Sequence, residues 1–86
     1  MTVRYSKQFV KQLAKQPDKV QQAFYVRLRL FQENPYDPFI RKHALGGKLK
    51  GLYSINVTGD VRALYEILND EIYLYQMIGS HSQLYG

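Results

Sequence analysis

Apolar residues recur at helical spacing over the first third of the chain. A short extended segment, residues 2–5, precedes Ser6, which is placed to cap a helix whose apolar residues are Phe9, Val10, Leu13 and Ala14. A Pro-Asp pair at residues 17–18 separates it from a longer helix that runs to about Glu33, with an apolar stripe at Val20, Ala23, Phe24, Leu28 and Phe31. Two prolines in the segment 34–38 end this helix, because proline cannot donate to the helix ladder. The pattern predicts a helix hairpin.

The spacing of apolar residues changes to a period of two from Lys50 onward. This alternation predicts three strands, at about residues 50–57, 61–68 and 72–79. The intervening pairs, Gly59-Asp60 and Asn69-Asp70, tolerate the positive φ of a tight hairpin. We therefore expect an antiparallel meander.

The two faces of this sheet have different compositions. If both turns are two-residue hairpins, Arg62 faces Val57 on one neighbouring strand and Met77 on the other. One face, on which the helices pack, then carries Val61, Ala63, Tyr65, Ile67, Ile72, Leu74 and Ile78. The opposite face, which is the candidate working surface, carries Tyr53, Ile55, Val57, Arg62, Leu64, Glu66, Tyr73, Tyr75 and Met77. The predicted fold is α+β, in a single domain over residues 1–86: a short strand, a two-helix hairpin and a three-stranded antiparallel meander, with the helices on one face of the sheet.

Composition narrows the classes of protein. The 86 residues are 45% hydrophobic and 22% charged, as in an ordinary globular chain with room for one domain. There is no cysteine and there are only two histidines, so we expect no disulfide, no metal site and no cofactor. The apolar runs are too short for a membrane span or a signal peptide. We expect a cytoplasmic protein with no membrane partner.

Charge is divided unevenly along the chain. Residues 1–50 hold eleven lysine and arginine residues against three acidic ones, a net charge of +8, whereas residues 51–86 carry −3. In the second part Arg62 is the one cation. A basic half of this kind favours polyanionic partners, although a solvated helix face would have the same composition.

The sequence lacks a phosphate-binding glycine loop and a zinc-protease motif, which leaves acid, base and charge-stabilising chemistry. If the alternation of the last strand continues to His81, its imidazole shares a face with Arg62. Other interpretations stay open: Arg62 could pair with Glu66, His81 could be an incidental polar residue in a frayed tail, and His43 could be part of a basic loop. The eight tyrosines, Tyr53 among them, offer flat rings on which bases could stack.

Three segments form a pattern typical of a known family. They are Lys50-Gly51, Arg62-Ala63-Leu64-Tyr65, and the run from Ile78 to Gly86 with its Gly-Ser-His motif. With the order of predicted elements, they make the chain resemble the RelE/ParE toxin superfamily of bacterial toxin–antitoxin systems, most closely its YafQ-like branch of messenger-RNA interferases. Leu49 departs from the tryptophan of this pattern, and Asn56 stands where a further histidine is expected.

The resemblance implies a metal-independent endoribonuclease that cleaves messenger RNA in the ribosomal A site. An acidic antitoxin would silence it in a hetero-oligomeric complex. The reaction needs a base for the ribose 2′-OH, an acid for the leaving 5′-oxygen, a cation for the phosphate charge and a stacking surface. The resemblance assigns His81 as general acid, Arg62 as the stabilising cation, His43 or Asp60 as general base, Tyr85 to stack on or orient the substrate, and Lys48 and Lys50 to hold phosphates.

One alternative belongs to a different functional class. ParE-like members of the superfamily share the fold but inhibit DNA gyrase by binding, without RNA chemistry. Such a protein has no need of a histidine after the last strand. The presence of His81 together with Arg62 favours the nuclease.

Overall fold

A computed structural model describes residues 1–37 and 43–85. Its elements, in chain order, are β1 (Thr2–Tyr5), α1 (Lys7–Ala14), α2 (Asp18–Glu33), β2 (His43–Ala44), the 3₁₀ turn η1 (Gly47–Leu49), β3 (Tyr53–Asn56), β4 (Val61–Leu68), β5 (Ile72–Ser80) and α3 (His81–Tyr85). The predicted α+β fold is confirmed, including the capping role of Ser6, whose Oγ accepts the Phe9 N–H at 3.0 Å. In the described part of the chain, no helix has both the length and the apolar character needed to cross a bilayer.

The strands form one five-stranded sheet in the order β1-β5-β4-β3-β2. β1 runs parallel to β5, with Thr2 opposite Ile72, and the other neighbours are antiparallel. The sheet is therefore larger than the predicted meander, because β1 joins it directly and the two-residue strand β2 adds a further edge. β3 starts at Tyr53 rather than at Lys50, since η1 and Gly51, with φ of +95°, form a turn before it.

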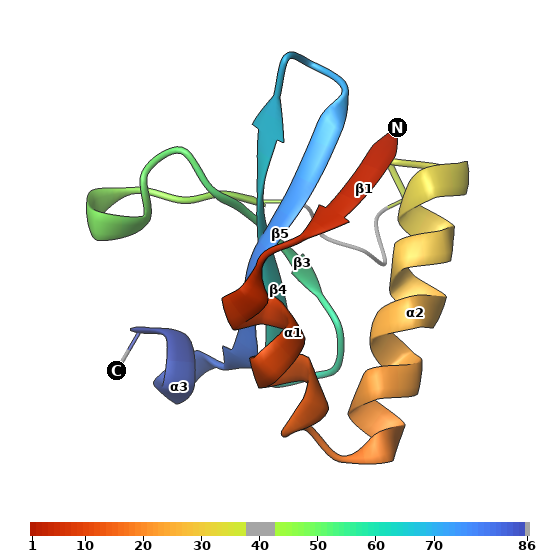
Figure 1. The fold of residues 1–86 in the computed structure, drawn as a ribbon, viewed down its shortest axis with the longest axis vertical. Helices are drawn as coiled ribbons and strands as arrows, with labels where there is room; N and C mark the ends of the chain where they lie inside the picture. The colour runs from red at the N-terminus through yellow and green to blue at the C-terminus, as the bar shows by residue number, and fades with distance from the viewer. Residues whose placement is uncertain (38–42, 86) are drawn as a thin grey trace.

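The helices α1 and α2 cover one face of the sheet, while α3 and the coil between β2 and β3 lie on the other side (Figure 1). The helix side and the sheet together bury a core of Phe9, Leu13, Phe24, Leu28, Phe31, Ile55, Val57, Val61, Ala63, Tyr65, Tyr75 and Ile78. Tyr75 lies at its centre, where its ring centroid is 5.2–5.6 Å from those of Phe9, Phe24 and Tyr65. This core fixes the sheet so that its other face is free to carry a site.

The first hairpin is longer than predicted. Asn56, not Val57, lies opposite Arg62. The connection between them is organised by Thr58, whose Oγ1 accepts the N–H groups of Asp60 at 3.3 Å and Val61 at 3.0 Å. A shift of one residue moves a whole strand's side chains to the opposite face. The predicted outward orientation of Tyr53, Ile55 and Val57 is therefore wrong, and Ile55 and Val57 are part of the core.

The pairing of β4 with β5 also differs from the prediction. Asn69 and Asp70 have the expected positive φ, but Leu68 pairs with Ile72, and a bulge follows between the pairs Tyr65–Tyr75 and Leu64–Met77. Because directly paired residues share a face, Tyr73 and Tyr75 lie on the helix side, and Ile72 and Leu74 on the other. The two shifts together place Gly79, not Met77, opposite Arg62.

Candidate functional site

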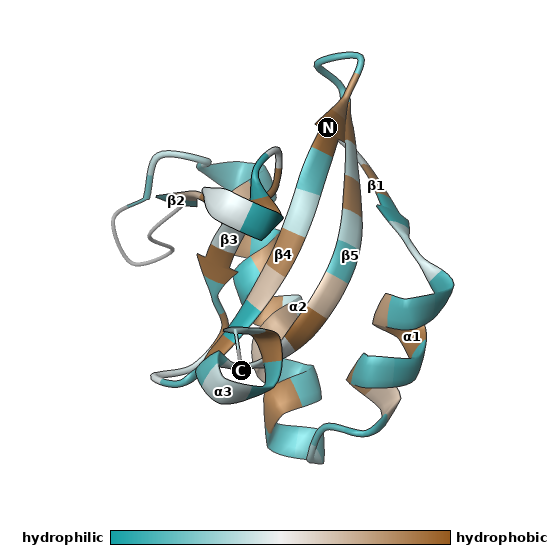
Figure 2. Ribbon diagram, turned by 90° about the vertical axis from the view of Figure 1, so that its left-hand side faces the viewer, coloured by the Kyte–Doolittle hydropathy of each residue, from teal (hydrophilic) through white to brown (hydrophobic). Residues whose placement is uncertain are grey.

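The face of the sheet turned away from α1 and α2 carries the candidate site. Figure 2 looks onto this face, with the coil between β2 and β3 along one edge and α3 at the end of β5. Two rows of paired residues cross it: Asn56, Arg62 and Gly79 form one row, and His43, Ser54, Leu64 and Met77 form the next. Arg62 and the segment leading to His81 therefore share a face, as predicted.

Arg62 is held by the backbone of the loop that precedes it. Its Nη1 donates to the carbonyl oxygens of Thr58, Gly59 and Val61 at 3.2–3.3 Å. The alternative ion pair with Glu66 is not among the contacts of Arg62, and Glu66 Oε1 accepts a hydrogen bond from Gln76 Nε2 at 2.5 Å. Neutral carbonyls orient a guanidinium without cancelling its charge. The half-buried Arg62 is thus fixed in place with its positive charge available to an anion.

Asp60 and His81 meet at the same end of the sheet. The backbone N–H of His81 lies 3.5 Å from Asp60 Oδ1, which joins the start of α3 to the β3–β4 loop. The His81 ring lies 4.7 Å from the Tyr85 ring, centroid to centroid, because residues four apart are neighbours on a helix. The side chains of Asp60, His81 and Tyr85 are all exposed. The fold thus gathers Asp60, Arg62, His81 and Tyr85 around one loop and one helical turn.

Sequence reasoning missed the helix that begins at His81. The alternation predicts either a continuing strand or a frayed tail there, and the structure has a turn of helix over His81–Tyr85. The signal was present in the sequence, because Ser80 and Gln83 have the Ser-x-x-Gln spacing of a capping box. A helix start, rather than a strand, therefore determines where the imidazole lies.

His43 lies on the same face but apart from this group. It pairs with Ser54 in the edge strand β2 and is exposed. Strand spacing and rise put its Cα roughly 12 Å from that of Arg62, two strands across and two residues along. The neighbouring Arg41 and Lys42, which suggested a basic loop, lie outside the described residues.

The remaining predicted binding residues separate into two groups. Lys48 and Lys50 are exposed on the coil around η1, where Gly47 has φ of +59° and so allows the tight turn. Tyr53, by contrast, faces the core: its ring is stacked on that of Tyr65, with centroids 5.6 Å apart and planes inclined by 23°. Tyr53 is therefore not brought together with the other candidates.

No three His, Asp or Glu side chains within residues 1–37 and 43–85 are close enough together to hold a metal ion. The ionisable groups of the site are instead two histidines, one aspartate and several cations. This set suits proton transfer and phosphate binding.

Comparisons with known proteins point in one direction. The family model for the bacterial toxin of type II toxin-antitoxin system, YafQ, matches residues 1–86. The structure of YafQ from E. coli is similar with a TM-score of 0.79 and 23% identity, over 98% of this chain and 97% of that one. A conserved hypothetical protein from Helicobacter pylori gives a TM-score of 0.70 and 31% identity, over 98% of both chains. An E. coli DinJ-YafQ complex gives 0.72 and 24%, over 98% and 97%. No curated protein sequence matches significantly.

Proposed function

Because the chain belongs to the YafQ family of toxins of bacterial type II toxin–antitoxin systems, we propose that it is a metal-independent endoribonuclease that cleaves messenger RNA in the ribosomal A site. One observation carries this proposal: His81, Asp60 and Arg62 gather at one end of the exposed sheet face. They provide a proton donor, a carboxylate and a fixed cation for a phosphodiester reaction.

The reaction is an attack by the ribose 2′-OH on the adjacent phosphorus. The bond from phosphorus to the 2′-oxygen forms, the bond to the 5′-oxygen breaks, and the products carry a 2′,3′-cyclic phosphate and a 5′-OH. His81 donates the proton that the leaving 5′-oxygen takes up, and Asp60 or His43 accepts the proton of the 2′-OH. Arg62 stabilises the additional negative charge on the phosphoryl oxygens, and its carbonyl contacts orient it before substrate binds.

The other candidates serve binding. Tyr85, 41% exposed and beside His81, offers a ring on which a base at the cleavage point can stack. Lys48 and Lys50 lie exposed on the coil at the edge of the same face and bind phosphates of the RNA or of the ribosome. These contacts would orient the message across the sheet.

The partner that silences the toxin is an acidic antitoxin protein. Two of the similar structures are E. coli complexes of YafQ with DinJ, which supports a toxin–antitoxin hetero-oligomer for this chain as well. The net charge of +5 favours an anionic partner. We place the reaction in the cytoplasm, where messenger RNA and ribosomes are found.

The test compares cleavage by the wild type and by His81→Gln. Purified protein is added to translating ribosomes, and primer extension maps breaks within A-site codons. His81→Gln keeps size and polarity but transfers no proton, so the cleavage rate should fall about 10²- to 10⁴-fold. If the wild type arrests growth without cutting RNA, and His81→Gln arrests growth equally, the nuclease is wrong and a gyrase-binding toxin replaces it.

A further inference from the structure

The helix α3 is too short to be stable by itself. It has five residues, whereas isolated helices shorter than about 12 residues are marginal in water. Its first residue is His81, so whatever holds the first turn also determines where the imidazole lies.

Two reciprocal hydrogen bonds close this first turn. Ser80 Oγ accepts the Gln83 N–H at 3.2 Å, and Gln83 Oε1 accepts the Ser80 N–H at 2.7 Å. This is a capping box, in which each residue satisfies a backbone N–H that the helix leaves open. Ser80 is also the last residue of β5 and pairs with Val61. The box therefore attaches α3 to the sheet at one defined orientation.

Gly79 provides the space that Gln83 needs. A Cβ at position 79 would lie 3.0 Å from Gln83 Oε1 and 3.1 Å from Gln83 Cβ. The side chain of Gln83 thus lies directly on the backbone of the residue that pairs with Arg62. Gln83 therefore contacts the row of paired residues that contains Arg62.

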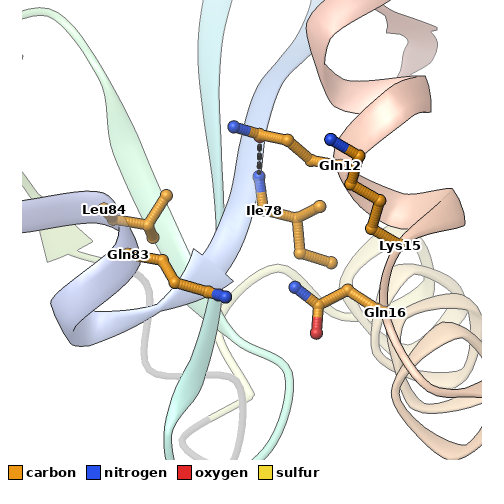
Figure 3. A pocket seen from close by; sticks show the side chains of 6 residues that line it. All are labelled: Gln12, Lys15, Gln16, Ile78, Gln83 and Leu84. Carbon is orange, nitrogen blue, oxygen red and sulfur yellow. Dashed lines mark hydrogen bonds between the residues drawn. The ribbon is translucent and has the colours of Figure 1, made fainter.

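Packing from α1 does not replace these bonds. A pocket of about 180 Å³ separates α1 from α3, and Figure 3 shows the side chains around it: Gln12, Lys15, Gln16, Ile78, Gln83 and Leu84. On the α1 side, Gln12 Oε1 accepts the Ile78 N–H at 2.9 Å. This hydrogen bond ties α1 to β5 and does not hold α3. The orientation of α3 depends on its capping box, on the contact of the His81 N–H with Asp60 Oδ1, and on the packing of Leu84 near Gly79.

We propose that Gln83 is a positioning residue for the reaction proposed above: with Ser80 it fixes the first turn of α3, and so holds the His81 ring beside Tyr85. This inference rests on the proposed function, in which His81 donates the proton. Gln83 acts through His81 and makes no contact with the reacting atoms. Its loss therefore lowers the fraction of molecules with a correctly placed imidazole. Binding of RNA phosphates by Lys48 and Lys50, which lie on a separate coil, is not affected.

The experiment uses two matched pairs of variants and one control. Gln83→Ala and Ser80→Ala each remove one bond of the box, whereas Gln83→Glu and Ser80→Thr keep the accepting oxygen. Gln12→Ala is the control, because Gln12 lines the same pocket and bonds the same strand without touching the box. Single-turnover cleavage at saturating protein gives the rate constant of the cleavage step separately from RNA affinity. NMR follows the His81 ring signals, which the nearby Tyr85 ring shifts.

We expect Gln83→Ala and Ser80→Ala to lower the cleavage rate constant by about 2- to 30-fold, the factor that loss of a capping bond implies. RNA affinity should fall less, because Tyr85 lies in α3 whereas Lys48 and Lys50 do not. The His81 ring signals should move toward those of an unstructured peptide in both alanine variants. In Gln83→Glu, Ser80→Thr and Gln12→Ala they should stay near those of the wild type. Ser80→Ala and Ser80→Thr decide the matter if Gln83→Ala does not fold.

Two outcomes would overturn the proposal. If Gln83→Ala weakens RNA binding and leaves the cleavage rate constant unchanged, Gln83 is a binding residue. If the His81 signals are the same in the wild type and both alanine variants, the box does not position the imidazole. The NMR measurement needs no substrate. A wild type that fails to cleave RNA would therefore count against the proposed function and leave the test of Gln83 intact.

Discussion

Replacing Tyr75 by phenylalanine should stabilise the protein. The Tyr75 side chain is 0% exposed, and its hydroxyl makes no hydrogen bond with any residue that the structure describes. A buried polar group without a partner costs about 1–3 kcal/mol, because it loses its bonds to water. Phenylalanine keeps the ring contacts with Phe9, Phe24 and Tyr65 and removes this cost. Tyr75→Phe should therefore raise the free energy of unfolding at pH 7 by about 1 kcal/mol or more.

The advantage of Tyr75→Phe should grow in alkaline solution. Burial raises the pKa of the Tyr75 hydroxyl above its ordinary value of 10.0, and the neighbouring Tyr65 acts in the same direction. A raised folded-state pKa means that the folded protein holds this proton more tightly than the unfolded chain. Stability from this group is present below pH 10 and is lost as the pH rises above it. At pH 11 the loss is about 1.4 kcal/mol for one such group, and Tyr75→Phe avoids it.

Urea unfolding at pH 7 and at pH 11, followed by circular dichroism, measures both effects. The control is Tyr36→Phe, since Tyr36 is 88% exposed and the same hydroxyl is lost from a solvated position. Its unfolding free energy should match that of the wild type within about 0.5 kcal/mol at both pH values. Two results would refute the reasoning. One is a Tyr75→Phe protein that is less stable than the wild type at pH 7. The other is a Tyr75→Phe protein whose free energy of unfolding falls as much as that of the wild type between pH 7 and pH 11.

Other substitutions test the binding surface, the fixed cation and the turn before β3. Reversing charge at Lys48 and Lys50 should make the affinity for RNA less dependent on salt. The slope of log affinity against log salt concentration, measured by filter binding, should become shallower by about 0.7 for each phosphate that is no longer neutralised. An unchanged slope would show that these two lysines do not bind phosphates. Arg62→Ala should lower the single-turnover cleavage rate about 10²- to 10³-fold, and Arg62→Lys should not restore it, because an ammonium lacks the planar guanidinium geometry. Gly47→Ala should destabilise the protein by about 1 kcal/mol in urea unfolding, since φ at Gly47 is +59° and no atom lies near the added Cβ. Gly46→Ala, with equal space and φ of −123°, should not.

The sequence was sufficient for those parts of the fold that depend on local signals. The capping of α1 by Ser6, the helix hairpin and the positive φ at Asn69 and Asp70 follow from residue types close together in the chain. The faces of the strands were harder, because one extra residue in each of the two hairpins and one bulge in β5 each reverse an alternation. Tyr75, predicted to face outward, lies at the centre of the core because of the extra residue in the second hairpin.

In the candidate site too, features set by local sequence signals were predictable and features set by strand register were not. The predicted shared face of Arg62 and the end of β5 holds as far as Gly79, because the extra residue in the second hairpin and the bulge compensate each other. His81 itself begins α3, so the alternation of the strand does not place its ring. The strand of His43 has only two residues, too few for any periodic signal. Tyr53 was a candidate on the strength of its ring alone, and the shifted hairpin puts that ring against Tyr65. The capping box of α3 was readable from the sequence, but its importance appears only with the helix.

The position of β5 in the sheet has a consequence for how the protein is made. β5 is the last strand to leave the ribosome, yet it lies between β1 and β4 and pairs with both. Until residues 72–75 are synthesised, β1 has no partner in the sheet, since its ladder is with β5 alone among the described strands. Pairing across this separation is slow to form. The sheet therefore cannot be completed before β5 has been synthesised, only a few residues before His81. His81 follows β5 directly, so under the proposed function the nascent chain completes its sheet and gains its proton donor in the same step.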